Sequence, residues 1–250
     1  MIVRNEKETD HRHVEELIRK AFYNLYVPGC TEHYLARVMR GHEDFIPELD
    51  LVLELDGRVI GSILYTKAKL SDAAGKEKEI LTFGPVCIAP EYQRMGYGRR
   101  LMETSFEKAA ALGYDVIVIF GSPANYVARG FKSCKKFNVC ADNGRYPAAM
   151  LVKELVPGAL DGRKWVYRDS PVMAFSEEEA QRYDDTLEKL EKKWQPSQEE
   201  FYILSHSFVE WDRAYAAGCV QAEEAFRCVE RGISERVFRK NGVTAAPAGA

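Results

Sequence analysis

The feature that most constrains the fold is an apolar stretch followed by two closely spaced glycines and a helical pattern. Residues 79–90, EILTFGPVCIAP, are typical of a strand, and Gly96 and Gly98 follow a few residues later. Apolar residues then recur with helical spacing until Gly113 ends the pattern. Residues 114–120, YDVIVIF, are apolar without alternation, which indicates a strand covered on both faces. We therefore predict a strand–helix–strand unit whose two strands are parallel.

The expected helix begins at the two glycines and has one apolar face. The positions that we expect to be buried are Leu101, Met102, Ser105, Phe106, Ala109 and Leu112. Glycine destabilises a helix by about 1 kcal/mol relative to alanine, so two glycines at its start indicate a need for bare backbone. The first amides of a helix have no intrahelical partner and lie at the positive end of its dipole, so they bind anions.

We therefore predict a phosphate site at this helix start. The amides that would hold the phosphate belong to Met95, Gly96, Tyr97, Gly98 and Arg99, with positive charge added by Arg94, Arg99 and Arg100. The alternative is a tight turn that uses glycine only for its backbone freedom. Two common phosphate motifs do not fit, because Leu101 replaces the third glycine of a dinucleotide fingerprint and no Gly-Lys-Ser/Thr follows the loop.

The segments around this unit predict further strands and helices. Residues 11–24 follow the helical period, and Thr9 or Asp10 can cap that helix. Asp56-Gly57 supplies a hairpin turn between two apolar runs. The other expected elements are strands at 1–5 and 148–155, a helix over 31–40, a hairpin over 49–70 and a short helix within 122–131.

The sequence changes character after residue 155. Ser176 and Ser197 are each followed three residues later by glutamate, as in a capping box, so we expect helices over 176–194 and 197–217. A third helix is expected over 220–239. The predicted organisation is an α/β domain over 1–155, a mainly helical extension over 156–242 packed on or next to it, and a flexible tail over 243–250.

Composition excludes several classes of protein. The formal net charge of -3 provides no basic field, so we expect no nucleic-acid partner. No apolar run reaches the roughly 20 residues that a membrane helix needs, and the amino terminus lacks the apolar core of a signal peptide. The six cysteines form no Cys-x-x-Cys pair, which indicates reduced thiols, a cytoplasmic location and no metal site.

The glycine loop resembles a known coenzyme site. Gln93-Arg-Met-Gly96-Tyr-Gly98 fits Gln/Arg-x-x-Gly-x-Gly/Ala, the coenzyme A pyrophosphate loop of the GNAT superfamily of N-acetyltransferases. NYVARGF, residues 125–131, is similar to that family's Asn…Tyr-x-x-x-Gly-Phe segment, and GSPANYVARGF is similar to the YhbS-like branch. The resemblance covers residues 1 to about 155 in element order and is at the level of motifs over 81–131.

The resemblance implies a GNAT-type α/β fold. Its sheet would be mixed, mostly antiparallel and twisted, flanked by helices, with acetyl-CoA between splayed parallel strands that end near Ile88 and Phe120. Pro85 has no N–H and could support a bulge in the first of these strands. By resemblance, the residues that contact the coenzyme would be Cys87, Ile88, Gln93, Arg94, Met95, Gly96, Tyr97, Gly98, Arg99 and Asn125.

The resemblance also assigns chemical roles. Tyr126 matches the family's general acid, which would protonate the leaving thiolate, although it could instead be a packed aromatic residue. We expect Cys87 to be a small buried apolar residue rather than a nucleophile, because direct attack on the thioester needs no acyl-enzyme. Glu79 is the nearest carboxylate before Pro85 but lies far upstream, and water could relay the proton instead, so no base is assigned.

Three functions remain open from the sequence. The leading one is acetyl transfer by direct attack from acetyl-CoA to a primary amine of a small molecule or peptide. The alternatives are an acetyl-CoA-binding sensor without turnover and a scaffold whose loop binds nothing. The acceptor wall would come from the first two helices, although its residues could equally be ordinary core; they are Tyr23, Tyr26, Cys30, His33 and Tyr34. The later helices, with Trp165, Trp194 and Trp211, could cover that site or form a homodimer contact.

Overall fold

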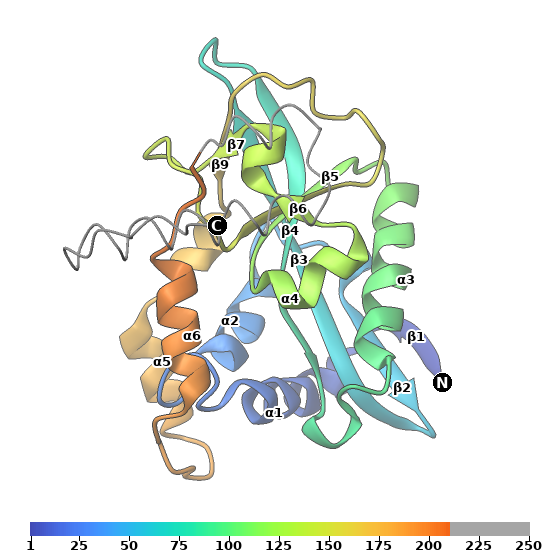
Figure 1. The fold of residues 1–250 in the computed structure, drawn as a ribbon. Helices are drawn as coiled ribbons and strands as arrows, with labels where there is room; N and C mark the ends of the chain where they lie inside the picture. Colours follow the sequence, from blue (N-terminus) through green and yellow to red (C-terminus); the bar gives the residue numbers. More distant parts are fainter. Residues whose placement is uncertain (211–250) are drawn as a thin grey trace, which may run out of the picture. The chain divides into compact units, whose positions relative to one another are not determined.

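The structure is a computed structural model that describes residues 1–210 (Figure 1). Met1–Val209 form one compact unit built on a single sheet. The strands are β1 Ile2–Asn5, β2 Leu51–Leu55, β3 Arg58–Ser71, β4 Glu77–Ile88, β5 Val116–Phe120, β6 Lys132–Ser133, β7 Val139–Cys140, β8 Met150–Glu154 and β9 Trp165–Arg168. The helices are α1 His11–Phe22, α2 Glu32–Met39, α3 Tyr97–Ala111, α4 Pro123–Tyr126, α5 Glu177–Asp184 and α6 Pro196–Ser205.

The sheet is mixed and mostly antiparallel. Its order is β1-β2-β3-β4-β5-β8-β6, and β9 pairs with both β3 and β7. The predicted parallel neighbours are confirmed as β4 and β5, whose ladder contains the single pair Leu81↔Ile117. Beyond that pair β4 continues to hydrogen-bond with β3, and β5 with β8, so the two strands separate toward their carboxyl ends.

A bulge interrupts β4 where the sequence predicts one. The β3–β4 pairing runs Ile63↔Val86 and then Tyr65↔Phe83, so Gly84 and Pro85 together oppose a single residue of β3. Proline cannot donate to the ladder, which is the physical reason for the interruption.

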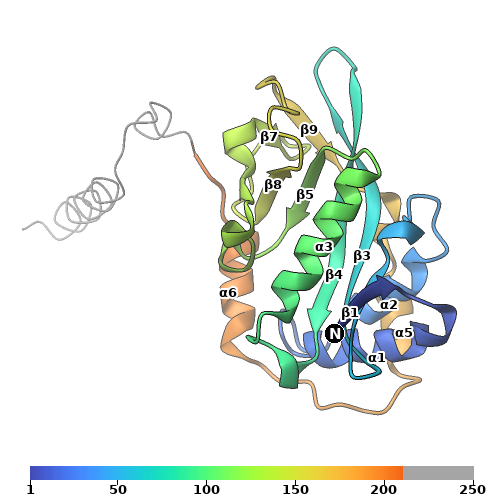
Figure 2. The ribbon, with the colours of Figure 1, turned by 90° about the vertical axis from the view of Figure 1, so that its right-hand side faces the viewer.

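Helices cover both faces of the sheet (Figure 2). The core cluster on one face includes Leu81, Phe83 and Ile117 and packs against α3, whereas α1 and α2 pack on the opposite face. Side chains alternate between faces along a strand, so Thr82 and Val118 point away from α3. The α3 face predicted to be buried is confirmed except at Leu112, which is 48% exposed because the helix ends at Ala111.

The hairpin turn and one helix start agree with the sequence. Asp56 and Gly57 have φ of 50° and 78°, as the short turn between β2 and β3 requires. The Ser176 side chain accepts a hydrogen bond from the Glu179 amide and caps α5. Asp10 occupies the position before α1, but its carboxylate accepts from Arg4 and from the Lys7 amide, so the predicted side-chain cap is not formed.

Two predictions for the later segment are wrong. The helix expected over 176–194 ends at Asp184, and the following chain runs as irregular backbone whose carbonyls bind residues of the α1–α2 loop. Ser197 does not cap a helix, because Pro196 already occupies the first turn of α6 and the Ser197 hydroxyl donates to the Leu25 carbonyl. The helix expected over 220–239, the end of the 197–217 helix, Trp211 and the tail 243–250 lie outside the described residues.

Within residues 1–210, no helix combines the length and apolar character needed to cross a membrane. The four cysteines of this part of the chain are buried free thiols.

Candidate active site

The glycine loop connects the end of β4 to the start of α3. Gly96 is the residue before α3 and has φ of 89°, a conformation that favours glycine. A Cβ placed on Gly98 would lie 3.5 Å from Ile88 Cγ1, an ordinary contact, so the packing of the protein does not require glycine there. The turn therefore explains Gly96, whereas a need for bare backbone at Gly98 would have to come from something outside the chain.

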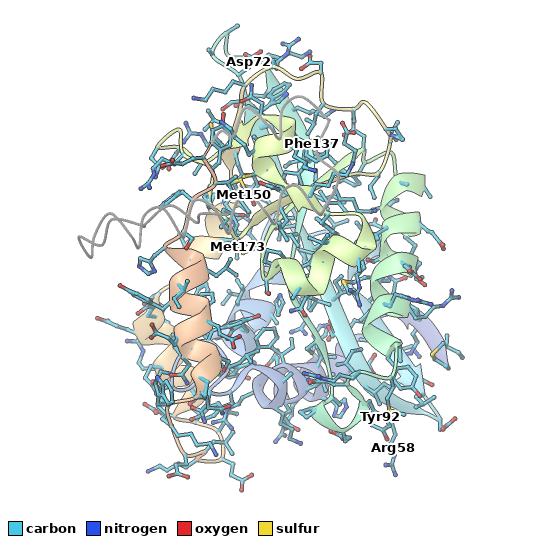
Figure 3. The ribbon with its side chains drawn as sticks, viewed as in Figure 1. Arg58, Asp72, Tyr92, Phe137, Met150 and Met173 are labelled. Atoms are coloured by element: carbon cyan, nitrogen blue, oxygen red, sulfur yellow. The ribbon has the colours of Figure 1, made fainter. Side chains whose placement is uncertain are left out.

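The loop exposes polar groups around the start of α3. Met95 is 64% exposed, and Arg94, Arg99 and Arg100 are exposed as well. Tyr92, labelled in Figure 3 at this end of the molecule, packs edge to face on the Tyr97 ring with centroids 6.2 Å apart. The structure thus brings the predicted phosphate residues together at one helix start, where amides and arginines supply positive charge.

The end of β4 lies directly behind this loop. Cys87 and Ile88 are buried, and Gln93 Nε2 donates to the Ile88 carbonyl oxygen over 3.0 Å, which holds the loop against the strand. Burial raises the pKa of the Cys87 thiol to about 12, so the thiol is neutral at pH 7. This favours the buried apolar role over a nucleophilic one.

Tyr126 lies just beyond the end of β5, in α4. Its ring packs against Phe83 of β4 and against Phe131, with centroids 5.9 Å and 5.7 Å away. A Cβ on Gly121 would stand 2.5 Å from Tyr126 Cε2, so that glycine makes room for the ring. Burial raises the pKa of Tyr126 above its usual range, which keeps the hydroxyl protonated and able to donate. The neighbouring Asn125 is exposed.

The residues expected to wall the acceptor site divide into two groups. His33 is fully buried and stacks on Tyr183, and its ring nitrogens lie 3.4 Å from Cys30 Sγ and 3.3 Å from Asp184 Oδ1. His33 and Cys30 therefore belong to the core. Tyr26 instead packs on Phe201 of α6, with ring centroids 4.7 Å apart.

The segment 185–209 follows a course that the sequence did not predict. At one end, Gln198 Nε2 donates to the Asn24 carbonyl, and at the other the Ala148 amide donates to the Ser207 carbonyl. The segment thus connects the α1–α2 loop with the residues that precede β8 (Figure 1). No local pattern could show this, because each contact joins residues far apart in the sequence.

A strand that diverges from its parallel neighbour, a glycine loop that opens the helix behind it and a tyrosine beyond the end of the second strand are the arrangement expected of a GNAT-type fold. Residues 14–133 match the model of the Acetyltransferase (GNAT) family. This match confirms the resemblance to the GNAT superfamily seen in the sequence.

Comparison with individual proteins agrees with this assignment. The chain is 31% identical over 108 residues to the uncharacterized N-acetyltransferase YjhQ of Escherichia coli (strain K12). That alignment spans 43% of this chain and 56% of YjhQ, little more than half of the relative's length.

Two crystal structures share the fold. The GNAT family N-acetyltransferase YhbS of Escherichia coli in complex with CoA matches with a TM-score of 0.59 at 22% identity, over 70% of this chain and 92% of that one. A GNAT family acetyltransferase of Brucella melitensis in complex with acetyl-CoA matches with a TM-score of 0.54 at 19% identity, over 69% and 97%.

Proposed function

We propose that the chain transfers an acetyl group from acetyl-CoA to a primary amine of a small molecule or peptide. The observation that carries the proposal is the loop at the start of α3, which lies behind the diverging ends of β4 and β5 with Tyr126 beyond β5. The relatives of the same fold that were crystallised with CoA and with acetyl-CoA support the choice of co-substrate.

In this proposal the pyrophosphate of acetyl-CoA binds the amides of residues 95–99, with Arg94 and Arg99 adding charge. Gln93 holds the loop through the Ile88 carbonyl, and Asn125 contacts the coenzyme from α4, beyond the end of β5. The pantetheine arm passes along the backbone of Cys87 and Ile88. A backbone amide of β4 then stabilises the negative oxygen that forms when the amine attacks the thioester carbonyl.

Tyr126 acts as the general acid in the same proposal. The carbon–sulfur bond breaks as the tetrahedral intermediate collapses, and the departing thiolate takes the Tyr126 proton. The Tyr126 hydroxyl carries its proton at pH 7, as the role requires, and the place of the residue just beyond the end of β5 supports it. Direct transfer requires no acyl-enzyme, which agrees with the neutral Cys87 thiol.

The predicted cellular location belongs to the same proposal. A cytoplasmic location is supported by the free thiols of Cys30, Cys87, Cys134 and Cys140, which are typical of a reducing compartment. The absence of nucleic-acid, membrane and metal partners and the homodimer stay predictions from the sequence.

Calorimetric titration with acetyl-CoA, CoA and NADH tests the binding step. We expect saturable binding of acetyl-CoA and CoA and none of NADH. A panel of ethanolamine, spermidine and a tripeptide with a free amino terminus, followed by thiol release, tests the transfer. Binding without thiol release would replace the transferase by a sensor, and no binding would leave the glycines with a structural role alone.

A further inference from the structure

A short strand from outside the family match reaches the place where β4 and β5 separate. β9 pairs with the end of β3 through Leu70↔Tyr167 and its two neighbouring pairs. This brings the buried Tyr167 ring onto the face of the sheet opposite α3, where it packs edge to face on Phe120 with centroids 5.8 Å apart. Burial raises the pKa of the Tyr167 hydroxyl well above its usual value, and a hydrogen bond with the nearby Thr82 side chain partly opposes that rise.

Tyr167 therefore contacts both of the diverging strands. Thr82 belongs to β4 and Phe120 is the last residue of β5, so the ring spans the two strands next to their single ladder pair. Phe83, adjacent to Thr82, points to the opposite face and packs against Tyr126. Tyr167 and the proposed acid thus approach the same point of the sheet from opposite faces.

Tyr167 is hydrogen-bonded to a carboxylate, that of Asp169. Its hydroxyl donates to Asp169 Oδ1 over 3.0 Å, and the Ser170 amide donates to the same oxygen over 2.9 Å. Asp169 is exposed, and no lysine, arginine or histidine of residues 1–210 forms an ion pair with it. The Ser170 hydroxyl donates in turn to Asp44, which lies 3.7 Å from His42. Two hydrogen bonds therefore fix Oδ1 of Asp169, and its Oδ2 can accept a proton.

The surroundings of Asp169 raise the pKa of its carboxyl, as a general base requires. Neighbouring protein atoms partly desolvate its carboxyl and raise the pKa, although the residue as a whole is exposed, and the hydrogen bonds from Tyr167 and Ser170 partly oppose that rise. A carboxylate with a raised pKa accepts a proton more readily near neutral pH than an ordinary aspartate does.

A buried hydroxyl on the same face provides a second observation. Thr66 of β3 lies directly opposite Thr82 in the β3–β4 ladder and is fully buried. Its Oγ1 has no hydrogen-bond partner among residues 1–210. Buried hydroxyls are normally paired, so this one marks a place where a water molecule or a substrate group can bind.

The rival carboxylate is less suitable on geometric grounds. Glu79 precedes Leu81, so it lies on the side of the parallel pair where β4 and β5 have not yet separated. It is also 3.6 Å from the Lys67 ammonium group, and this ion pair occupies it.

We infer that Asp169 is the general base of the acetyl transfer and that Tyr167 is its positioning residue. The inference rests on the proposed transferase function. Asp169 takes one proton from the substrate ammonium group, and the neutral amine then attacks the thioester carbonyl carbon. The carbon–nitrogen bond forms and the carbon–sulfur bond breaks. The thiolate takes the Tyr126 proton, and the second nitrogen proton restores Tyr126 through solvent.

The test compares Asp169→Asn with Asp161→Asn, a surface carboxylate of the same segment that pairs with Arg163. Thiol release is measured from pH 5 to 9 with the amine of the ethanolamine, spermidine and tripeptide panel that reacts fastest. We expect Asp169→Asn to lower kcat/KM by about 100-fold at pH 7, the lower end of the range for a general base, and to lose the wild-type rise in rate at low pH. Acetyl-CoA affinity should stay the same in both variants, and Asp161→Asn should keep the wild-type profile.

Tyr167→Phe separates a positioning role from a structural one. Removing the hydroxyl takes away a hydrogen bond that lowers the pKa of Asp169, so the low-pH limb should move to higher pH. A merely destabilised protein would lose rate without that movement.

The outcomes distinguish the inference from the function on which it rests. If the wild type is active and Asp169→Asn keeps the full rate and the same pH profile, the inference alone is overturned. The inference is also overturned if Glu79→Gln, and not Asp169→Asn, loses the low-pH limb. Wild-type protein that binds acetyl-CoA but releases no thiol with any amine would overturn the proposed function, and the inference with it.

Discussion

Replacing Gly96 by alanine gives a direct test of the phosphate loop, because the chain contains a matched control. Gly96 and Gly113 stand at the two ends of α3 with φ of 89° and 93°. A Cβ on either one would meet no atom within 4 Å. The two substitutions therefore impose the same backbone strain and no clash, and differ only in whether a ligand is expected beside them.

The expected loss of stability is the same for both variants. A left-handed conformation costs a non-glycine residue about 1–2 kcal/mol, and alanine recovers about 0.4–1 kcal/mol by restricting the unfolded chain. We therefore expect the free energy of unfolding to fall by roughly 1 kcal/mol in each case, or about 2–4 °C in Tm. Denaturant and thermal unfolding measure both values.

Only the Gly96 variant should lose coenzyme affinity. Its new methyl group enters the open space in front of the helix start, where the pyrophosphate is expected. We expect at least a tenfold rise in the Kd of acetyl-CoA, about 1.4 kcal/mol, and no change for Gly113→Ala, as measured by calorimetric titration. Equal affinities in two folded variants would refute the assignment of the loop to phosphate binding.

Two other predictions concern buried titratable groups. Tyr126→Phe should lower kcat about 100-fold while the Kd of acetyl-CoA is unchanged, and an unaltered rate of thiol release would remove Tyr126 from the mechanism. Burial lowers the pKa of His33 below its usual 6.5, so the unfolded chain binds the proton more tightly than the folded one. The contribution of the neutral His33 to the free energy of unfolding should therefore be complete above about pH 6.5. It should decrease as the pH falls toward the pKa of His33 in the folded protein. Unfolding titrations at several pH values should show this slope in the wild type and not in His33→Gln.

The strand–helix–strand unit could be predicted because each of its signals is local. An apolar run, a glycine before a helix and a second apolar run occur within a short stretch, and the bulge at Pro85 follows from a missing N–H. Except for Asn125, the predicted coenzyme residues likewise lie on one loop and one strand end, so their proximity follows from the order of the elements.

The later segment could not be predicted, because distant contacts determine its course. The chain after Asp184 is fixed by hydrogen bonds to the α1–α2 loop, which override the helical pattern toward residue 194. A short strand could be expected within residues 156–175, but its pairing with β3 depends on residues far away in the sequence. Asp169 therefore carried no signal that a reading of motifs could detect.

The contribution of β9 to the sheet means that the unit of homology and the unit of folding differ in this protein. The family match ends at residue 133, but Trp165 is 2% exposed and packs in one cluster with Leu70 and Ile80. A fragment that ends at residue 133 would expose these apolar surfaces to water and would be prone to aggregation. Fragments for expression, or for grafting this domain onto another protein, should therefore extend to Val209.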